Sequence, residues 1–319
     1  MMSGADPLTA LVAGAVEQVR LALVDVPGLI PLASAPFFFR PLVMVVLLGI
    51  VSGVVGVLVN LRGAEFSAEA LVHAVFPGIV AGAAFWGIDA IIPAASIVAM
   101  IAAAGLTLLS HHSGRAVGAR RSAGGGGAEA GTAVLLTGFF SVGIILSLAT
   151  GDMSGQLEAL MFGRLLEITD AGLARALVAC LVAVILVAAT WRGQVAYAFD
   201  PVGARAAGHR LLALDLALNA AIAAVVVSAS TAVGTLLVIG ALIVPGATGR
   251  VLAHRVRPMV IIAVATGVLG GYLGMLAAVM PSPRPVSPQA AVSLATTALL
   301  LGAIIAASAR RRLRGREGA

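Results

Sequence analysis

Long runs of apolar residues, separated by short polar stretches, make up most of the chain. After Pro41 each run is roughly 16 to 22 residues long, about the length that an α-helix needs to cross the hydrocarbon core of a bilayer. Several runs contain Pro, Gly or a charged residue, which indicates broken or re-entrant segments. The predicted spans are 41–60, 68–88, 93–110, 132–150, 174–191, 211–230, 231–249, 259–279 and 290–308. We therefore expect an all-α, polytopic membrane protein with about eight or nine transmembrane helices, since the division of 211–249 depends on a turn near Ser228–Thr231.

The first 36 residues differ from the rest because charged residues stand among their leucines and valines. Apolar positions at helical spacing predict an amphipathic helix over Thr9–Val26 that lies at the membrane interface. These positions are Leu8, Leu11, Val12, Ala15, Val19 and Ala22. The alternative is a poorly ordered extension. The predicted organisation is an interfacial segment at 1–36, a transmembrane domain at 37–309 and an arginine-rich tail at 310–319.

Three polar side chains interrupt the second apolar run at a regular spacing. Glu65, Glu69 and His73 are four residues apart, so they lie on one helix face, with about 6 Å of axial rise between neighbours. Two carboxylates and an imidazole can bind a divalent cation, and such groups are costly inside a bilayer unless they have a function. Pro77, one turn later, is expected to break the backbone pattern and free carbonyl groups. Two structural alternatives are a Glu69–His73 polar pair that fixes helix packing and an ion pair between Glu65 and Arg62.

The composition excludes several other functions. Of the residues, 60% are hydrophobic and 11% charged, and the mean hydropathy is +1.08, which is outside the range of soluble domains. There is no lysine, so the glycine run at 124–127 is no phosphate-binding P-loop, and any ATP hydrolysis must come from a separate subunit. The single cysteine, Cys180, excludes a disulfide framework. The arginines stand at the ends of apolar runs, which indicates membrane topology and not nucleic-acid binding.

Arginine also predicts the orientation. With the C-terminus in the cytoplasm and nine spans, fifteen of the twenty arginines lie inside, as the positive-inside rule requires. The stretch 111–131 is then a flexible cytoplasmic linker, in which the adjacent His111 and His112 make a poor metal site. The segment 151–173 becomes an outer loop whose acidic residues attract cations, contact a binding protein or are simply hydrophilic. They are Asp152, Glu158, Glu167 and Asp170.

Two further patterns lie within the later spans. Asp215 and Asn219 repeat the four-residue spacing, either along the path of an ion or, for Asp215, as an interfacial anchor near Arg210. Glycines at small-xxx-small spacing predict close helix packing, within one chain or between two copies. They are Gly267, Gly270, Gly271 and Gly274.

Three stretches, in this order, carry a resemblance to a known family. They are Glu69-Ala-Leu-Val-His-Ala-Val-Phe-Pro-Gly78, Ala198-Phe-Asp-Pro-Val-Gly-Ala-Arg-Ala-Ala-Gly208, and Ala232 to Arg250 with Val-Pro-Gly-Ala-Thr at 244–248. The chain resembles the ABC-3 permeases from about Pro41 to Ala307. These are the transmembrane subunits of bacterial ABC importers for manganese, zinc and sometimes ferrous iron. The family's usual Asp is Glu69 here, and Glu65 is an acid that the common pattern does not supply.

The resemblance implies a permease fold of the type II ABC importer kind in the bacterial cytoplasmic membrane. It further implies a homodimer, cytoplasmic ATPase subunits, an extracytoplasmic metal-binding protein, and no resident cofactor other than transported Mn²⁺ or Zn²⁺. Glu69 and His73 become metal ligands, with Glu65 as a weaker candidate. The loop 250–258 becomes the coupling helix that contacts the ATPase, and Asp200–Gly208 a second contact. The coupling residues so implied are Pro245, Gly246, Arg250, His254, Arg255 and Arg257.

Two rival functions remain at this stage. One is an ABC permease for cobalamin, haem or a siderophore, which has a wide apolar path and does not need Glu69 or His73. The other is a secondary metal carrier driven by an ion gradient, which needs no partner subunits.

Overall fold

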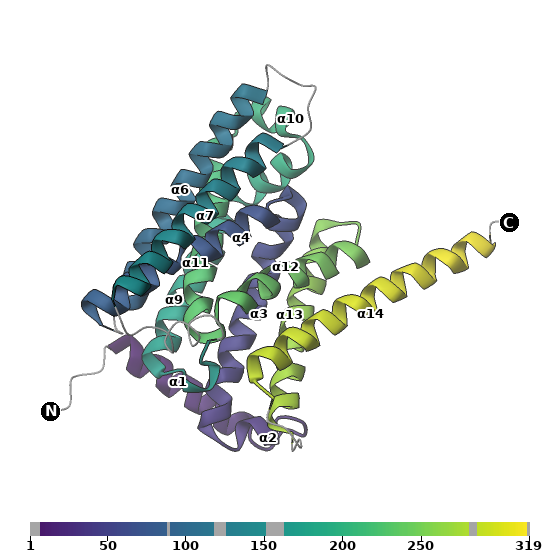
Figure 1. The fold of residues 1–319 in the computed structure, drawn as a ribbon. Helices are drawn as coiled ribbons and strands as arrows, with labels where there is room; N and C mark the ends of the chain where they lie inside the picture. Colours follow the sequence, from purple (N-terminus) through teal and green to yellow (C-terminus); the bar gives the residue numbers. More distant parts are fainter. Residues whose placement is uncertain (1–6, 88–89, 118–125, 151–162, 281–285, 318–319) are drawn as a thin grey trace.

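Long helices run between the two ends of a bundle, and shorter helices connect them (Figure 1). The computed structural model describes residues 7–87, 90–117, 126–150, 163–280 and 286–317, and within these ranges nearly all residues are helical and none is in a strand. The helices are α1 (Pro7–Leu23), α2 (Ile30–Ala33), α3 (Pro36–Arg62), α4 (Glu65–Ala74), α5 (Phe76–Ala81), the π-helical turn η1 (Gly82–Trp86), α6 (Ile91–Val117), α7 (Gly126–Ala149), the 3₁₀ turn η3 (Leu165–Glu167), α9 (Asp170–Phe199), α10 (Pro201–Ala206), α11 (Leu211–Val233), α12 (Thr235–Leu252), α13 (Val256–Val279) and α14 (Pro288–Glu317). The all-α prediction is confirmed.

The number of spans also agrees with the sequence. In the described ranges, eight helical segments are long and apolar enough to cross a bilayer, and α12 contributes a shorter apolar helix over Leu237–Leu252. The turn expected at Ser228–Thr231 is wrong by a few residues. Helix α11 continues to Val233 and ends at Gly234, whose φ of +86° is a conformation that glycine adopts at little cost.

The second predicted span is broken, as its proline indicates. Helix α4 ends at Ala74, and after Val75 helix α5 begins at Phe76 with Pro77 in its first turn. Proline has no N–H to donate to the carbonyl four residues earlier, which here belongs to His73. The span then ends in a π-helical turn at Gly82–Trp86. The candidate metal ligands therefore lie on a short helix that is separated from the rest of its span.

Helix α3 lies at the centre of the bundle and packs against α9, α11, α12 and α13. In α3, 72% of the best membrane-spanning window is buried, against 17% in α7 and 22% in α14, so these two helices lie on the outside. The glycine pattern of α13 packs within the chain. Cβ atoms added at Gly267 and Gly274 would lie 2.5 Å from the oxygen of Gly49 in α3 and 2.3 Å from the Cα of Val292 in α14.

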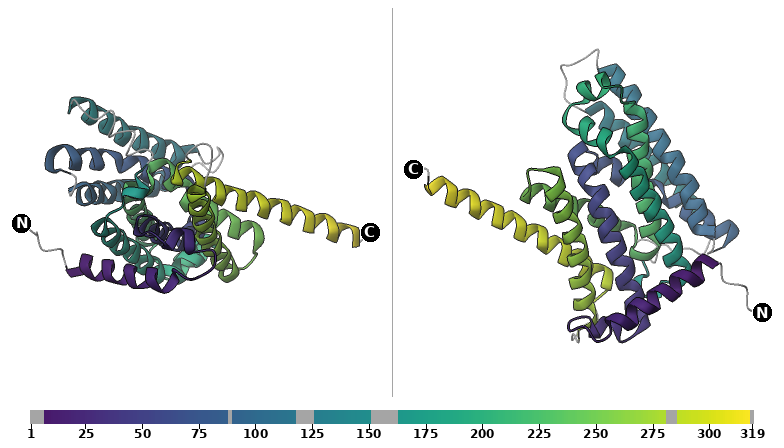
Figure 2. Two further views of the ribbon diagram at one scale, coloured as in Figure 1. Left: turned by 90° about the horizontal axis from the view of Figure 1, so that it is seen from below. Right: turned by 180° about the vertical axis from the view of Figure 1, so that it is seen from behind.

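The N-terminal helix lies across one end of the bundle (Figure 2). It spans Pro7–Leu23, close to the predicted Thr9–Val26, and Val12 is its buried residue. Arg20 holds α1 in place by donating to the carbonyl of Ala33 at 3.0 Å and by pairing with Glu17. This pairing lowers the pKa of Glu17 below its ordinary value. The predicted location at a membrane interface stays a prediction.

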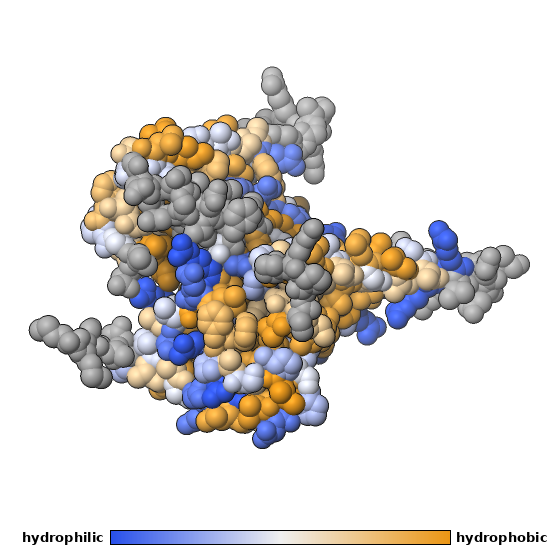
Figure 3. All heavy atoms as spheres, turned by 60° about the horizontal axis from the view of Figure 1, so that its bottom comes forward, coloured by the Kyte–Doolittle hydropathy of each residue, from blue (hydrophilic) through white to orange (hydrophobic). Residues whose placement is uncertain are grey.

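Two connections differ from their predictions. The linker expected at 111–131 is shorter, because α6 continues to Val117 and α7 begins at Gly126. His111 therefore lies on a helix instead of a loop. At the C-terminus α14 projects from the bundle, with an apolar surface that becomes hydrophilic toward its end (Figure 3). The helix is continuous to Glu317 and so includes most of the predicted tail.

Candidate metal site and the neighbouring polar network

The stripe predicted from the sequence lies on α4, near the middle of the bundle between α7 and α12 (Figure 1). Glu65, Glu69 and His73 are all partly exposed, whereas Ala68 and Leu71 on the opposite face are buried. The ring of His73 packs edge-on against Phe140 of α7, with 5.4 Å between the ring centroids. Helix α4 thus presents its ionisable groups on its open face.

The polar atoms of Glu69 and His73 are available to a ligand. Neither side chain makes a hydrogen bond or an ion pair within the chain, judged on all residues that the structure describes. Among the described residues, no buried side-chain nitrogen or oxygen lacks a hydrogen-bond partner. Because the polar atoms of Glu69 and His73 have no such partner, they are not buried and are accessible to water or an ion. The alternative in which they form a hydrogen-bonded structural pair is wrong.

The described part of one chain does not bring three metal-ligating side chains together. Among the described residues, no three His, Cys, Asp or Glu side chains come close enough together to hold a metal ion. Glu65 and His73 are eight residues apart on the helix, or about 12 Å along its axis. Glu69 and His73 thus remain as a pair of candidate ligands with one helical turn between them.

Arg62, the expected partner of Glu65, pairs with a different carboxylate. Arg62, the last residue of α3, forms an ion pair with Asp215 of α11 and donates to Gln194 of α9. Its guanidinium also lies over the ring of Tyr197, 3.7 Å from the centroid. The Glu65–Arg62 ion pair is therefore wrong as a prediction, because Arg62 points to a carboxylate 153 positions away in the sequence.

Asp215 is the centre of a polar network that joins four helices. Besides Arg62, it contacts His111 of α6, with 2.8 Å from Nε2 to Oδ2, and accepts a 3.4 Å hydrogen bond from the Tyr197 hydroxyl. Gln194, which is fully buried, donates to the backbone carbonyl of Leu214 at 2.7 Å. The prediction of an anchor near Arg210 named the wrong arginine. Sequence reasoning missed His111, Gln194 and Tyr197, although all of them stand near helix ends on the predicted cytoplasmic side.

The network faces a polar cavity of about 1070 Å³. Asp215 and Asn219 line it together, as their spacing predicts, and the amide of Asn219 donates to Thr107 of α6 at 2.9 Å. Ala64 and Ser67 bring α4 to the same cavity. Other basic side chains that line it are Arg205, His209 and Arg210.

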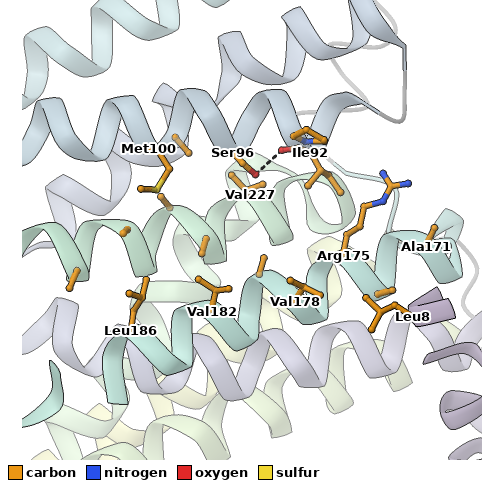
Figure 4. A pocket seen from close by; sticks show the side chains of 18 of the residues that line it. Leu8, Ile92, Ser96, Met100, Ala171, Arg175, Val178, Val182, Leu186 and Val227 are labelled. Atoms are coloured by element: carbon orange, nitrogen blue, oxygen red, sulfur yellow. Dashed lines mark hydrogen bonds between the residues drawn. The ribbon is translucent and has the colours of Figure 1, made fainter. Parts of the chain in front are cut away.

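A second cavity of about 1070 Å³ lies between α6, α9 and α11, with the first residues of α1 at one end. Figure 4 shows apolar side chains such as Met100, Val182 and Leu186 pointing into it, with Arg175 among the lining residues. The hydroxyl of Ser96 donates to the carbonyl of Ile92 at 2.8 Å. None of the described residues that line this cavity is acidic or a histidine, and none comes from α4. A bare divalent ion would gain nothing here.

The predicted coupling residues occupy three different environments. Pro245 and Gly246 are buried inside α12, where a Cβ on Gly246 would lie 2.4 Å from the oxygen of Gly56, so Gly246 packs against α3 within the chain. Arg250 donates to the carbonyl of Asn60 at 2.6 Å. His254, Arg255 and Arg257 are exposed.

The separate helix expected over 250–258 does not form. The segment is divided between the end of α12 at Leu252, a short turn and the start of α13 at Val256. A short helix forms instead within the second predicted contact, over Pro201–Ala206 in α10. Asp200 caps it by accepting hydrogen bonds from the N–H groups of Val202 and Gly203.

The predicted outer loop is described only in part. Asp152 and Glu158 lie outside the described residues. Glu167 pairs with Arg164 at 3.1 Å, and Asp170 pairs with Arg40 of α3 at 2.8 Å. Both carboxylates therefore have partners within the chain.

One family of known proteins matches most of the chain. The model described as the ABC 3 transport family matches residues 34–307. The chain belongs to the ABC 3 transport family. The match includes every candidate residue of α4 and of the Asp215 network, and it begins after α1.

Relatives in the ABC 3 transport family share about three quarters of the chain. The manganese transport system membrane protein MntC of Listeria monocytogenes is 30% identical over 243 residues, which cover 75% of this chain and 80% of the relative. The chelated iron transport system membrane protein YfeC of Yersinia pestis is 27% identical over 250 residues, covering 77% of this chain and 80% of the relative.

A solved structure shares this fold. PsaBC from Streptococcus pneumoniae, solved in complex with Fab, superposes with a TM-score of 0.70 and covers 90% of this chain and 94% of that one. The sequence identity of 22% makes this a likeness of fold alone. The expected permease fold is confirmed.

Proposed function

We propose that this member of the ABC 3 transport family is the transmembrane permease subunit of an ATP-driven importer for a divalent transition metal, which is Mn²⁺ or Zn²⁺, with Fe²⁺ as a further candidate. The observation that carries the proposal is the pair Glu69 and His73, which lie one turn apart on the partly exposed face of α4 and have no hydrogen-bond or ion-pair partner among the described residues. A carboxylate and an imidazole at this spacing bind a divalent ion from a single helix. The names of MntC and YfeC support a transition metal as cargo.

A second copy of the chain completes the site in this proposal. Two chains related by a two-fold axis contribute two carboxylates and two imidazoles, a mixed oxygen and nitrogen set that suits Mn²⁺ or Zn²⁺. The partial exposure of Glu69 and His73 supports this arrangement, because both side chains are accessible from outside the chain. Glu65, about 12 Å from His73 along the helix, then acts at an earlier or later position of the ion.

The other subunits of the transporter are separate proteins. The chain lacks lysine, so separate cytoplasmic ATPase subunits hydrolyse ATP, and an extracytoplasmic binding protein delivers the metal. We place the C-terminus and the turn with His254 and Arg255 on the cytoplasmic side of the bacterial inner membrane. Exposed residues of that turn and of α10 are the surface offered to the ATPase.

Metal-stimulated ATPase activity of the reconstituted complex tests the proposal. Glu69→Ala and His73→Ala should each remove most of the stimulation by Mn²⁺ or Zn²⁺ and leave the basal ATPase rate unchanged. Glu129→Ala, which removes an exposed carboxylate at the start of α7, is the matched control and should respond like the wild type. Equal stimulation of all three variants would refute the role of α4.

The stoichiometry tests the shared site separately. Equilibrium binding of Mn²⁺ to the purified complex should reach one tightly bound ion per two permease chains at α4. One tight ion per chain would contradict a site shared by two copies.

The apolar cavity is the observation that favours a bulkier cargo, such as the cobalamin, haem or siderophore of the rival reading. In that case transport of the free ion is absent, and Glu69→Ala and His73→Ala keep normal activity. A carrier driven by an ion gradient would instead accumulate metal in vesicles that contain this chain without an ATPase. Both rivals thus give results that differ from those of the proposed importer.

A further inference from the structure

We propose that the polar cavity beside Asp215 and the apolar cavity between α6, α9 and α11 together bind one anionic phospholipid. Its phosphate lies in the polar cavity and an acyl chain lies in the apolar one. This site is independent of the cargo, because it includes neither Glu69 nor His73. Two features carry it, which are arginines without partners in one cavity and an open apolar groove that begins beside them.

The polar cavity holds more positive than negative charge. Arg62, Arg205 and Arg210 line it, and Asp215 is the acidic residue among its described lining residues. The carboxylate of Asp215 is paired with Arg62 and in contact with His111, so it does not neutralise the other two arginines. Arg205 and Arg210 make no hydrogen bond or ion pair with any residue that the structure describes. The cavity therefore repels a cation and attracts an anion.

The groups around the cavity suit a phosphate in particular. Guanidinium groups bind phosphate oxygens through paired N–H donors, and Arg205 and Arg210 are exposed, so both are free to turn toward a ligand. His209, between them in the sequence, lines the same cavity. The first turn of α11 also borders the cavity at Leu211–Ala213, and no side chain caps this helix. N–H groups at a helix start add to the attraction for an anion.

The apolar cavity begins where the polar cavity ends. Ala213 of α11 lines both of them. From Ala213 the apolar cavity follows α11 to Val227, which is fourteen residues or about 21 Å of helix. One leaflet of the hydrocarbon core is about 15 Å thick. The apolar cavity is thus long enough for the acyl chain of a lipid whose headgroup lies beside Arg210.

The apolar cavity is also open to the outside of the bundle. Helix α11 packs against both α6 and α9, and Met100 of α6 and Val182 of α9 face each other across the cavity (Figure 4). Met100, Val182 and Leu216 are exposed although they line it, so a chain can enter from the bilayer. Small side chains on α11 leave room for it, at Ala213, Ala217, Ala220, Ala223 and Ala224.

Charge and shape together select the occupant. A free phosphate would leave the apolar cavity unfilled, and a zwitterionic headgroup would bring a further positive charge to a basic cavity. Basic pockets between transmembrane helices bind anionic headgroups for this reason. Because Arg205 belongs to α10 and Arg210 precedes α11, one phosphate bound by both holds α10 against α11.

Native mass spectrometry of the full-length chain tests the headgroup. The chain is titrated in detergent micelles with phosphatidylglycerol or with phosphatidylcholine of the same acyl chains. The wild type should bind phosphatidylglycerol about tenfold more tightly, as expected for one or more charge-assisted hydrogen bonds. Arg210→Gln should lower this preference about threefold, and Arg205→Gln together with Arg210→Gln should abolish it. Arg192→Gln is the matched control, because it removes the same charge from an exposed residue of α9 that lines neither cavity, and it should keep the preference.

A second pair of variants tests the acyl chain. Ala217→Leu fills part of the apolar cavity and should weaken the binding of phosphatidylglycerol about fivefold. Ala306→Leu adds the same side chain at an exposed position of α14, outside both cavities, and should have no effect. If Ala217→Leu does not fold, Ala220→Leu takes its place, because Ala220 lines the same cavity.

Two competition experiments exclude other occupants. Glycerol 3-phosphate carries the same phosphate without acyl chains and should not displace phosphatidylglycerol at about a hundredfold excess, since it cannot use the apolar cavity. Displacement would show a site for a free anion and overturn the lipid site. The titration is then repeated with the ATPase subunits bound, an arm that alone rests on the proposed function. Loss of the lipid on assembly would show that an acidic protein surface takes the arginines, and would also overturn the proposal.

Three outcomes of the titrations contradict the site directly. They are equal affinity of the wild type for both lipids, a preference that survives the loss of Arg205 and Arg210, and an effect of Ala306→Leu equal to that of Ala217→Leu. Metal-stimulated ATPase activity does not enter these measurements. Failure of the lipid site and failure of the importer are therefore distinguishable.

Discussion

Gly267→Ala should destabilise the bundle by about 2 kcal/mol, because it forces α3 and α13 apart. The added Cβ would lie 2.5 Å from the oxygen and 2.8 Å from the Cα of Gly49. These are backbone atoms, so no side-chain rotation relieves the overlap, and the upper end of the usual overpacking cost of about 1–3 kcal/mol applies. The higher helix propensity of alanine offsets about 1 kcal/mol of this cost. The difference corresponds to a rise of roughly 30-fold in the unfolded population.

Cys180 provides the assay. It is the single cysteine of the chain, it is 1% exposed, and it lies on α9, which packs against α3. A thiol reagent can reach it only after the bundle opens, so its labelling rate follows the population of open molecules when reclosing is fast. Purified protein in detergent micelles should label roughly 30-fold faster with Gly267→Ala than without it.

The control is Gly302→Ala on α14, where a Cβ would meet no atom within 4 Å. This variant should label no faster than the wild type. Gly49→Ala should resemble Gly267→Ala, and the double variant should cost less than the sum, because both substitutions open the same contact. If Gly267→Ala labels at the wild-type rate, the backbone contact between α3 and α13 is refuted.

Three further variants follow from the structure. Gln194→Leu removes a buried side chain that holds Arg62, and labelling of Cys180 should report a loss of about 1–3 kcal/mol, whereas an unchanged rate would contradict the network. Asp200→Ala removes the cap of α10 and should cost that helix about 1 kcal/mol, measured by faster hydrogen exchange in Pro201–Ala206 and not elsewhere. Because the ion pair with Arg20 lowers the pKa of Glu17 in the folded state, the ionised carboxylate stabilises the docked α1 at pH values above the unfolded pKa of 4.5. This stabilisation is lost as the pH falls through the folded pKa of Glu17. The hydrogen-exchange protection factors of α1, which correct for the intrinsic pH dependence of exchange, should therefore fall only below pH 4.5, and Glu17→Gln should remove that fall.

The sequence by itself determined the class of fold and the candidate ligands. Hydropathy and helix length are properties of short stretches, so they predicted the spans without any knowledge of packing. The spacing of Glu69 and His73 put them on one helix face, and Pro77 indicated the break that follows. Glycine spacing on α13 predicted close packing but not its partner.

Only the tertiary structure decided which residues meet. Arg62 is three positions from Glu65, yet it pairs with Asp215, because α3 ends beside the start of α11. His111 changed from a linker residue to a neighbour of Asp215 once α6 proved longer than its apolar run. The α13 glycines found their partners on α3 and α14. Sequence periodicity describes one helix at a time, whereas ion pairs and helix contacts depend on how separate helices are placed side by side.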